Sequence, residues 1–221
     1  MRLAKLASIL VLAGGTFVYA APQPPPPAPG AGQPPPGGQR GAPGQPGGRG
    51  GGRGRGAIQL LTVTSPAFQD GGMIPAKYPQ AGPEVSPPIS WSNVPEGVQG
   101  FVLIAHDVDA AVAPGTDDIL HWMVWNIPGT ATSLPEGLAH GPELENGFRQ
   151  ISATGPFYRG PGAAAAGPAH HYVFELFAVD TPIEVPAVGA SPPQTRAAVL
   201  AAMAGHVKAK GALVGLFKRQ G

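Results

Sequence analysis

The fold is decided by residues 101–110, which read FVLIAHDVDA. This stretch opens with five apolar residues, as a buried strand does, and it closes with two aspartates. A carboxylate beside such a run is costly unless it is paired or functional. Because strand ends are rigid, side chains placed there can converge on one site with little disorder. The end of this strand is therefore the first place to look for chemistry.

Two further segments place polar residues at the start of apolar runs. Residues 121–128, HWMVWNIP, open with His121. Residues 170–178, HHYVFELFA, open with two histidines and Tyr172. All three segments have the length and composition of strands, so their polar ends are candidates for a common site.

Strand geometry predicts which of these polar side chains share a face. Residues two apart in an extended segment point to the same side. We therefore expect Asp107 and Asp109 to point the same way, and likewise His170 and Tyr172. The histidines next to them in the chain have the opposite parity and are expected to be structural.

The first 20 residues read as a secretory signal peptide. Arg2 and Lys5 form its basic start, residues 6–18 its apolar stretch, and VYA at residues 18–20 its cleavage site. The apolar stretch is shorter than the ~20 residues that span a bilayer, although an uncleaved anchor remains an alternative. The chain has no cysteine, which excludes disulfides and thiol catalysis and argues against a lipid anchor. We expect an exported protein, periplasmic or extracellular.

Residues 21–56 form a low-complexity segment of proline, glycine and arginine. They offer almost no side chains to bury, so we predict a disordered linker. The segment carries four arginines and no acidic residue, which leaves weak contact with an anionic membrane or wall polymer as an alternative. An exported chain meets little nucleic acid, and we expect no nucleic-acid partner.

Residues 57–221 are expected to form one domain, since this length is ample for a single core. They contain eight Lys or Arg against thirteen Asp or Glu, so this part is acidic. Six segments read as strands: residues 60–64, 89–91, 101–107, 120–127, 172–179 and 213–217. One helix is predicted, with Ser191 as its N-cap, Pro192 next and Gly211 as its end. The pattern predicts a mainly β fold of the sandwich kind with one helix near the C-terminus.

Several motifs, taken in order, resemble the phosphatidylethanolamine-binding protein family, and more narrowly its bacterial Raf kinase inhibitor-like branch. The motifs are SPPISW at 86–91, D-x-D-A at 107–110, H-W-x-V-x-N-I-P at 121–128, H-H-Y-x-F at 170–174, AMAGHV at 202–207 and GALVG at 211–215. The resemblance covers roughly residues 58–219. It implies an antiparallel β-sandwich with few peripheral helices.

Carried over position by position, the resemblance also implies an anion-binding pocket. Its residues would be Asp107, Asp109, His121, Gly160, Pro161, His170 and Tyr172. Imidazole, phenol and backbone N–H groups donate hydrogen bonds to phosphate oxygens, and glycine lets the backbone approach closely. The aspartates would either accept from an imidazole nitrogen or pair with the ammonium of a headgroup such as ethanolamine.

The chain departs from the family pattern at the rim of this pocket. The family usually reads D-P-D-A-P, whereas Val108 and Ala111 replace the two prolines here. Proline restricts φ, so both replacements change the backbone around the aspartates. The alanines at residues 163–166 stand where the family commonly has prolines. We expect the rim to be reshaped while the polar residues of the pocket are kept.

Three classes of function remain open. The leading hypothesis is a non-enzymatic binding protein, without cofactor, for a phosphate-bearing small molecule or lipid headgroup, with modulation of a protein partner as a further option. Some members of the family inhibit proteases, so an inhibitor of a secreted protease or hydrolase is an alternative. A metal-dependent hydrolase using Asp107, Asp109, His121 and His170 is another. The chain contains no H-E-x-x-H metal motif and no G-x-S-x-G nucleophile motif.

Overall fold

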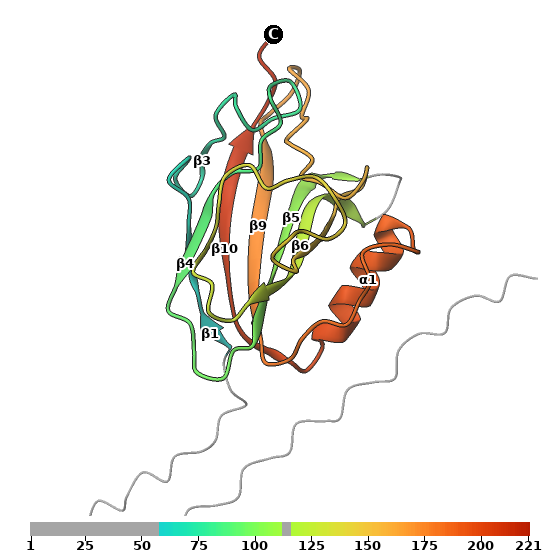
Figure 1. The fold of residues 1–221 in the computed structure, drawn as a ribbon. Coiled ribbons are helices and arrows are strands. Elements are labelled where there is room, and N and C mark those ends of the chain that lie inside the picture. Colours follow the sequence, from blue (N-terminus) through green and yellow to red (C-terminus); the bar gives the residue numbers. More distant parts are fainter. Residues whose placement is uncertain (1–57, 112–115) are drawn as a thin grey trace, which may run out of the picture. The chain divides into compact units, whose positions relative to one another are not determined.

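The computed structural model describes residues 58–111 and 116–221. The predicted signal peptide, linker and domain start at residue 57 lie outside these residues. Along the chain the elements are β1 (Gln59–Leu60), β2 (Thr62–Thr64), β3 (Gly72–Met73), β4 (Ile89–Ser92), β5 (Gly100–Ala111), β6 (Asp118–Pro128), β7 (Ser133–Leu134), β8 (Arg149–Ile151), β9 (His170–Val179), α1 (Pro192–Met203) and β10 (Val207–Phe217) (Figure 1). In the described part of the chain, no helix combines the length and the apolar composition needed to cross a bilayer.

The strands form two sheets. The large sheet has the order β1-β10-β9-β5-β6-β8, with β3 also paired to β10, and the small sheet has the order β2-β4-β7. The mainly β prediction is confirmed. However, the large sheet is mixed, because β1 and β3 pair with β10 in parallel. Both are two-residue segments at the edge of the sheet, where no hairpin dictates the direction of pairing.

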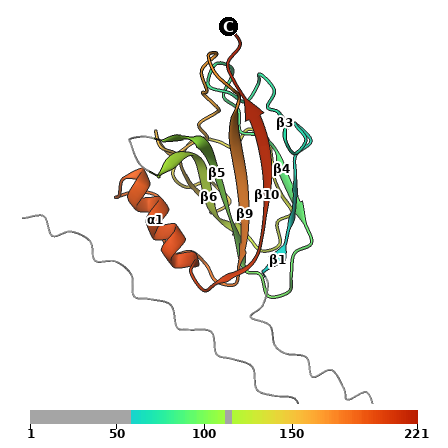
Figure 2. The same cartoon turned by 180° about the vertical axis from the view of Figure 1, so that it is seen from behind.

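The strand β5 packs on both of its faces. Phe101, Leu103 and Ala105 belong to the core that the large sheet shares with the small sheet. Val102 and Ile104 belong to the core under α1. Figure 1 and the reverse view in Figure 2 show α1 and β4 on opposite sides of the large sheet. Burial on both faces explains why this strand reads as a continuous apolar run.

The predicted helix begins where expected but ends earlier. Ser191 is its N-cap, as predicted, whereas α1 stops at Met203 and Gly205 makes the turn with φ of 84°. Gly211, predicted to end the helix, lies inside β10. A Cβ atom on Gly211 would lie 2.3 Å from the carbonyl oxygen of Leu61, so the glycine serves close packing of backbones rather than a helix end.

An ion network ties the helix to the large sheet on the face of β5 opposite to Asp107. His106 Nδ1 bonds to the carboxylate of Asp118, which Arg196 of α1 also binds. His106 Nε2 lies 3.4 Å from Glu175 Oε2. Burial opposes the charge on His106, but the interactions with the carboxylates of Glu175 and Asp118 outweigh it and raise the pKa of the imidazole.

The raised pKa predicts a stability contribution that depends on pH. The contribution is fully present below the ordinary imidazole pKa and is lost as pH rises through the raised value in the folded state. We expect His106→Gln to lower the free energy of unfolding by about 1 to 3 kcal/mol near pH 6, and by clearly less near pH 9. Urea unfolding at the two pH values measures this.

The matched control is His140→Gln. The His140 ring stacks on Phe157 with a centroid distance of 4.9 Å, and it makes no ion pair within the described residues. A loss of stability in His106→Gln that is equal at both pH values would contradict the predicted role of the ion network.

Candidate functional site

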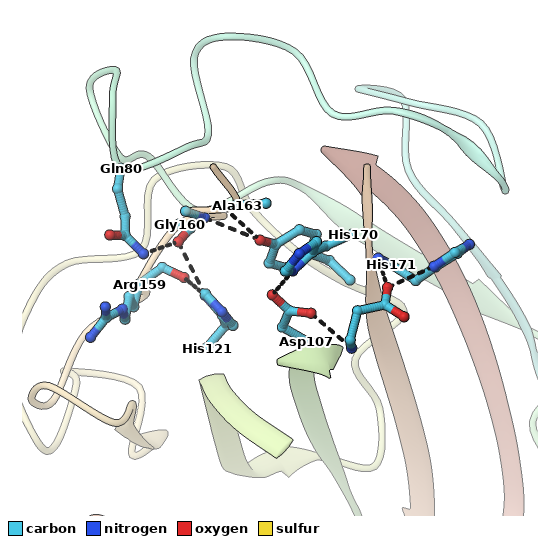
Figure 3. A network of polar contacts seen from close by, with 11 residues as sticks. Gln80, Asp107, His121, Arg159, Gly160, Ala163, His170 and His171 are labelled. Carbon is cyan, nitrogen blue, oxygen red and sulfur yellow. Dashed lines mark hydrogen bonds and ion pairs between the residues drawn. The ribbon is translucent and has the colours of Figure 1, made fainter. Parts of the chain in front are cut away.

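Three strand ends meet at the candidate site. Because β5 runs antiparallel to both β6 and β9, its end lies beside their beginnings. This brings Asp107 of β5 next to His121 of β6 and His170 of β9 (Figure 3). Tyr172 of β9 pairs with Asp107 across the two strands. Asp107 shares the parity of Ala105, which faces the core between the two sheets. The site therefore lies at one end of that core.

The carboxylate of Asp107 is the buried charge of the site. Asp107 is 3% exposed. Its Oδ2 accepts a hydrogen bond from His170 Nδ1 at 2.9 Å, and its Oδ1 accepts from the backbone N–H of Asp109 at 3.0 Å. Both oxygens are thus compensated, as a buried carboxylate requires. The His170 side chain is 27% exposed, so the ring connects this buried charge to the surface.

A β-bulge places His121 in the site. Ala105 pairs with Trp122 and His106 with Leu120, so β6 has one extra residue, His121, between these two pairs. A bulge lets neighbouring residues face the same side and redirects a side chain. The His121 ring consequently meets the edge of Tyr172 with a centroid distance of 5.0 Å, while Trp122 stays in the core.

The protonation of His121 follows from its partners. Its Nδ1 lies 2.9 Å from the carbonyl oxygen of Arg159 and 3.1 Å from that of Gly160. Carbonyl oxygens only accept, so Nδ1 carries the hydrogen. Burial lowers the pKa of the ring, which is therefore neutral near pH 7. Neutral His121 presents a lone pair at Nε2, and it can donate a second hydrogen bond only after it is protonated.

The hydroxyl of Tyr172 holds the loop that crosses the site. It accepts hydrogen bonds from the backbone N–H groups of Gly162 at 3.2 Å and Ala163 at 3.1 Å. Burial and the nearby carboxylate of Asp107 raise the pKa of Tyr172 to about 12. The phenol therefore stays protonated at any ordinary pH.

Gly160 lies too close to the neighbouring backbone to carry a side chain. A Cβ atom there would lie 2.2 Å from the carbonyl oxygen of Tyr78. The N–H of Gly160 donates to Glu84 Oε1 at 3.1 Å, and its carbonyl accepts from Gln80 Nε2 at 2.7 Å. Pro161 accepts from the backbone N–H of Gln80 at 3.0 Å. The loop N–H groups are thus paired within the protein, and an anion that used them would have to replace these bonds.

Asp109 does not point the same way as Asp107, so the parity prediction is wrong for this pair. Its Oδ2 accepts from the backbone N–H of His171 at 2.6 Å and contacts Nδ1 of the same residue at 2.7 Å. The Asp109 side chain is 40% exposed. The register shifts between Asp107 and Ala111, where β5 has extra residues and the two-residue alternation no longer holds.

Three residues near the site were not among the predicted site residues. Gln80 and Glu84 brace Gly160 from a distant part of the chain, and no sequence spacing links them to it. Arg159 directly precedes the Gly160-Pro161 pair, and its carbonyl holds His121. An arginine beside a predicted anion loop is a charge signal that the sequence does contain.

Two hollows of the described structure lie away from this site. One, of about 140 Å³, is lined by residues at the opposite end of β5, including Gly100. The other, of about 570 Å³, lies beside α1 and is lined by Asp118, Arg196 and Leu200 among others. Within residues 58–111 and 116–221, no three His, Asp or Glu side chains gather as metal ligands would.

Comparisons with known proteins agree with this architecture. The chain is 35% identical over 161 residues to a UPF0098 protein of Methanothermobacter thermautotrophicus, covering 72% of this chain and 99% of that protein. It is 33% identical over 165 residues to LppC of Mycobacterium tuberculosis, whose name proposes a lipoprotein, covering 73% of this chain and 74% of that protein.

Solved structures show the same relationship. The structure of YbcL from E. coli, described as a new member of the mammalian PEBP family, matches with a TM-score of 0.61 and 26% identity, covering 72% of this chain and 99% of that one. The structure of a PEBP homologue from Chlamydia trachomatis matches with a TM-score of 0.61 and 29% identity, covering 73% of this chain and 99% of that one. A sequence model described as Phosphatidylethanolamine-binding protein matches residues 64–218. The match to this family model over most of the chain and the identity to the Methanothermobacter relative show that the chain belongs to the phosphatidylethanolamine-binding protein family.

Proposed function

We propose that this protein is a non-enzymatic binding protein that takes a phosphate-type anion or a phospholipid headgroup at the Asp107–His170 site. The observation that carries the proposal is the His170 ring itself. Its Nδ1 is held by the buried carboxylate of Asp107, while the side chain remains 27% exposed. A ring oriented in this way presents Nε2 to a ligand, and the protonated ring donates a charge-assisted hydrogen bond to an oxyanion.

The surrounding groups support binding rather than metal-dependent hydrolysis. Asp107 is committed to His170 and to the backbone N–H of Asp109. Asp109 binds His171 instead of joining the other carboxylate. A metal ion bound by Asp107, Asp109, His121 and His170 would therefore require the site to be rebuilt. The phenol of Tyr172, protonated at ordinary pH, adds a neutral polar group beside the anion.

We also propose that the protein acts outside the cytoplasm, in the periplasm or the extracellular space. The basic and apolar start of the chain supports export. A relative named as a lipoprotein supports it too. This chain has no cysteine, so lipid attachment at a cysteine is not part of the proposal. A headgroup-binding site in that compartment would meet membrane lipids or their soluble phosphate esters.

The geometry of the site predicts that His170 is required for binding and that its neighbour His171 is not. In calorimetric titration of the full chain with phosphate and with phosphoethanolamine, we expect His170→Ala to weaken binding by roughly tenfold to a hundredfold. The control is His171→Ala, which removes an exposed ring that contacts only Asp109 among the predicted site residues. Equal losses in both variants, or no binding by the folded wild-type chain, would contradict the proposal.

The protonation of the imidazoles predicts the pH dependence of binding. Burial lowers the pKa of His121, so its second donor appears only at acidic pH. We expect affinity for sulfate, whose own charge is constant in this range, to fall as pH rises from about 5.5 to about 8.5. Constant affinity across the range would show that no imidazole proton takes part in binding.

A further inference from the structure

The charges at the candidate site do not by themselves favour an anion. Asp107 contributes a buried carboxylate, and Glu84 places a second one against Gly160. Burial lowers the pKa of His121, which is neutral near pH 7. Tyr172 is neutral as well. A permanent positive charge close to these groups would therefore have a large effect on what the site binds.

Arg159 provides such a charge. Its backbone carbonyl accepts the His121 Nδ1 hydrogen bond at 2.9 Å, which ties the residue to the site. Burial has the largest effect on the His121 pKa and lowers it. The hydrogen bond to the Arg159 carbonyl and the charge of Asp107 raise the pKa, whereas the charge of Arg159 lowers it. The guanidinium is therefore within electrostatic reach of the ring. Figure 3 shows the Arg159 side chain extending on the side of His121 away from His170.

The Arg159 guanidinium has no partner within the described part of the chain, unlike those of Arg149 and Arg196. Arg149 donates to Glu143 at 2.8 Å, and Arg196 binds Asp118. The Nε of Arg159 is buried and makes no hydrogen bond to any described residue. A buried donor without a partner carries a desolvation cost, and no described group neutralises the charge of this guanidinium.

We propose that Arg159 binds a second anionic group of the ligand, so that the site selects headgroups with a carboxylate in addition to the phosphate over zwitterionic phosphoethanolamine-type headgroups. This inference rests on the proposed function. The phosphate lies against His170, and the additional carboxylate reaches past His121 to the guanidinium. The fork of an arginine matches the two oxygens of a carboxylate, which a lysine would not do equally well.

The test compares two probes that differ by one carboxylate, O-phosphoserine and O-phosphoethanolamine, with inorganic phosphate as the common reference. All three are titrated into the full chain. We expect the wild type to bind O-phosphoserine at least roughly tenfold more tightly than O-phosphoethanolamine. Arg159→Gln should remove this preference and leave phosphate binding much less affected.

Two further variants make the result specific. Arg149→Gln carries the same change of charge on β8, beside Trp125, and should keep the preference. Arg159→Lys should retain only part of the preference for O-phosphoserine. If thermal unfolding shows that Arg159→Gln does not fold, Arg159→Lys takes its place in the comparison.

The outcomes separate this inference from the proposed function. If phosphate binds and the wild type does not distinguish the two probes, or if the preference survives in Arg159→Gln, the role of Arg159 is overturned and the anion site stands. If none of the three probes binds to the folded wild type, the proposed function fails and this inference fails with it.

Discussion

A carboxylate buried at the end of a strand that packs on both faces has to be compensated where it lies. Asp107 meets this constraint with one hydrogen bond from His170 and one from its own chain at Asp109. An uncompensated charge in this place would cost several kcal/mol. Because losing the hydrogen bond from His170 would incur part of this cost, the carboxylate fixes the orientation of the His170 ring. The candidate site is thus an extension of the hydrophobic core rather than a group of loops.

The same constraint gives the large sheet two different faces. On the face toward the small sheet, the core ends in Asp107, Tyr172 and the bulged His121. On the face toward α1, the next residue, His106, anchors an ion network that includes Arg196 of the helix. Adjacent residues of one strand therefore belong to the candidate binding site on one side and attach the helix on the other.

Much of this could be predicted from sequence because strand alternation depends only on neighbouring residues. The apolar runs identified β4, β5, β6, β9 and part of β10, and their polar ends identified Asp107, His121, His170 and Tyr172. Residues 60–64, predicted as one strand, hold the end of β1 and all of β2, whereas β3, β7 and β8 have only two or three residues and gave no such signal. The end of α1 was predicted too far along the chain. Glycine commonly ends a helix, but Gly211 is needed for close packing against Leu61.

By itself the sequence determined the mainly β fold and the strand ends that carry the polar side chains, because these follow from local composition and spacing. Its motifs, in their order, carried the resemblance to the family. Only the tertiary structure decided which side chains meet. The extra residue at His121 turns its ring toward Tyr172, and the irregular end of β5 turns Asp109 toward His171. The roles of Gln80 and Glu84, and the lack of a partner for Arg159 among the described residues, became visible only when distant segments packed together. Register shifts and long-range contacts depend on the whole packed chain, and no local pattern encodes them.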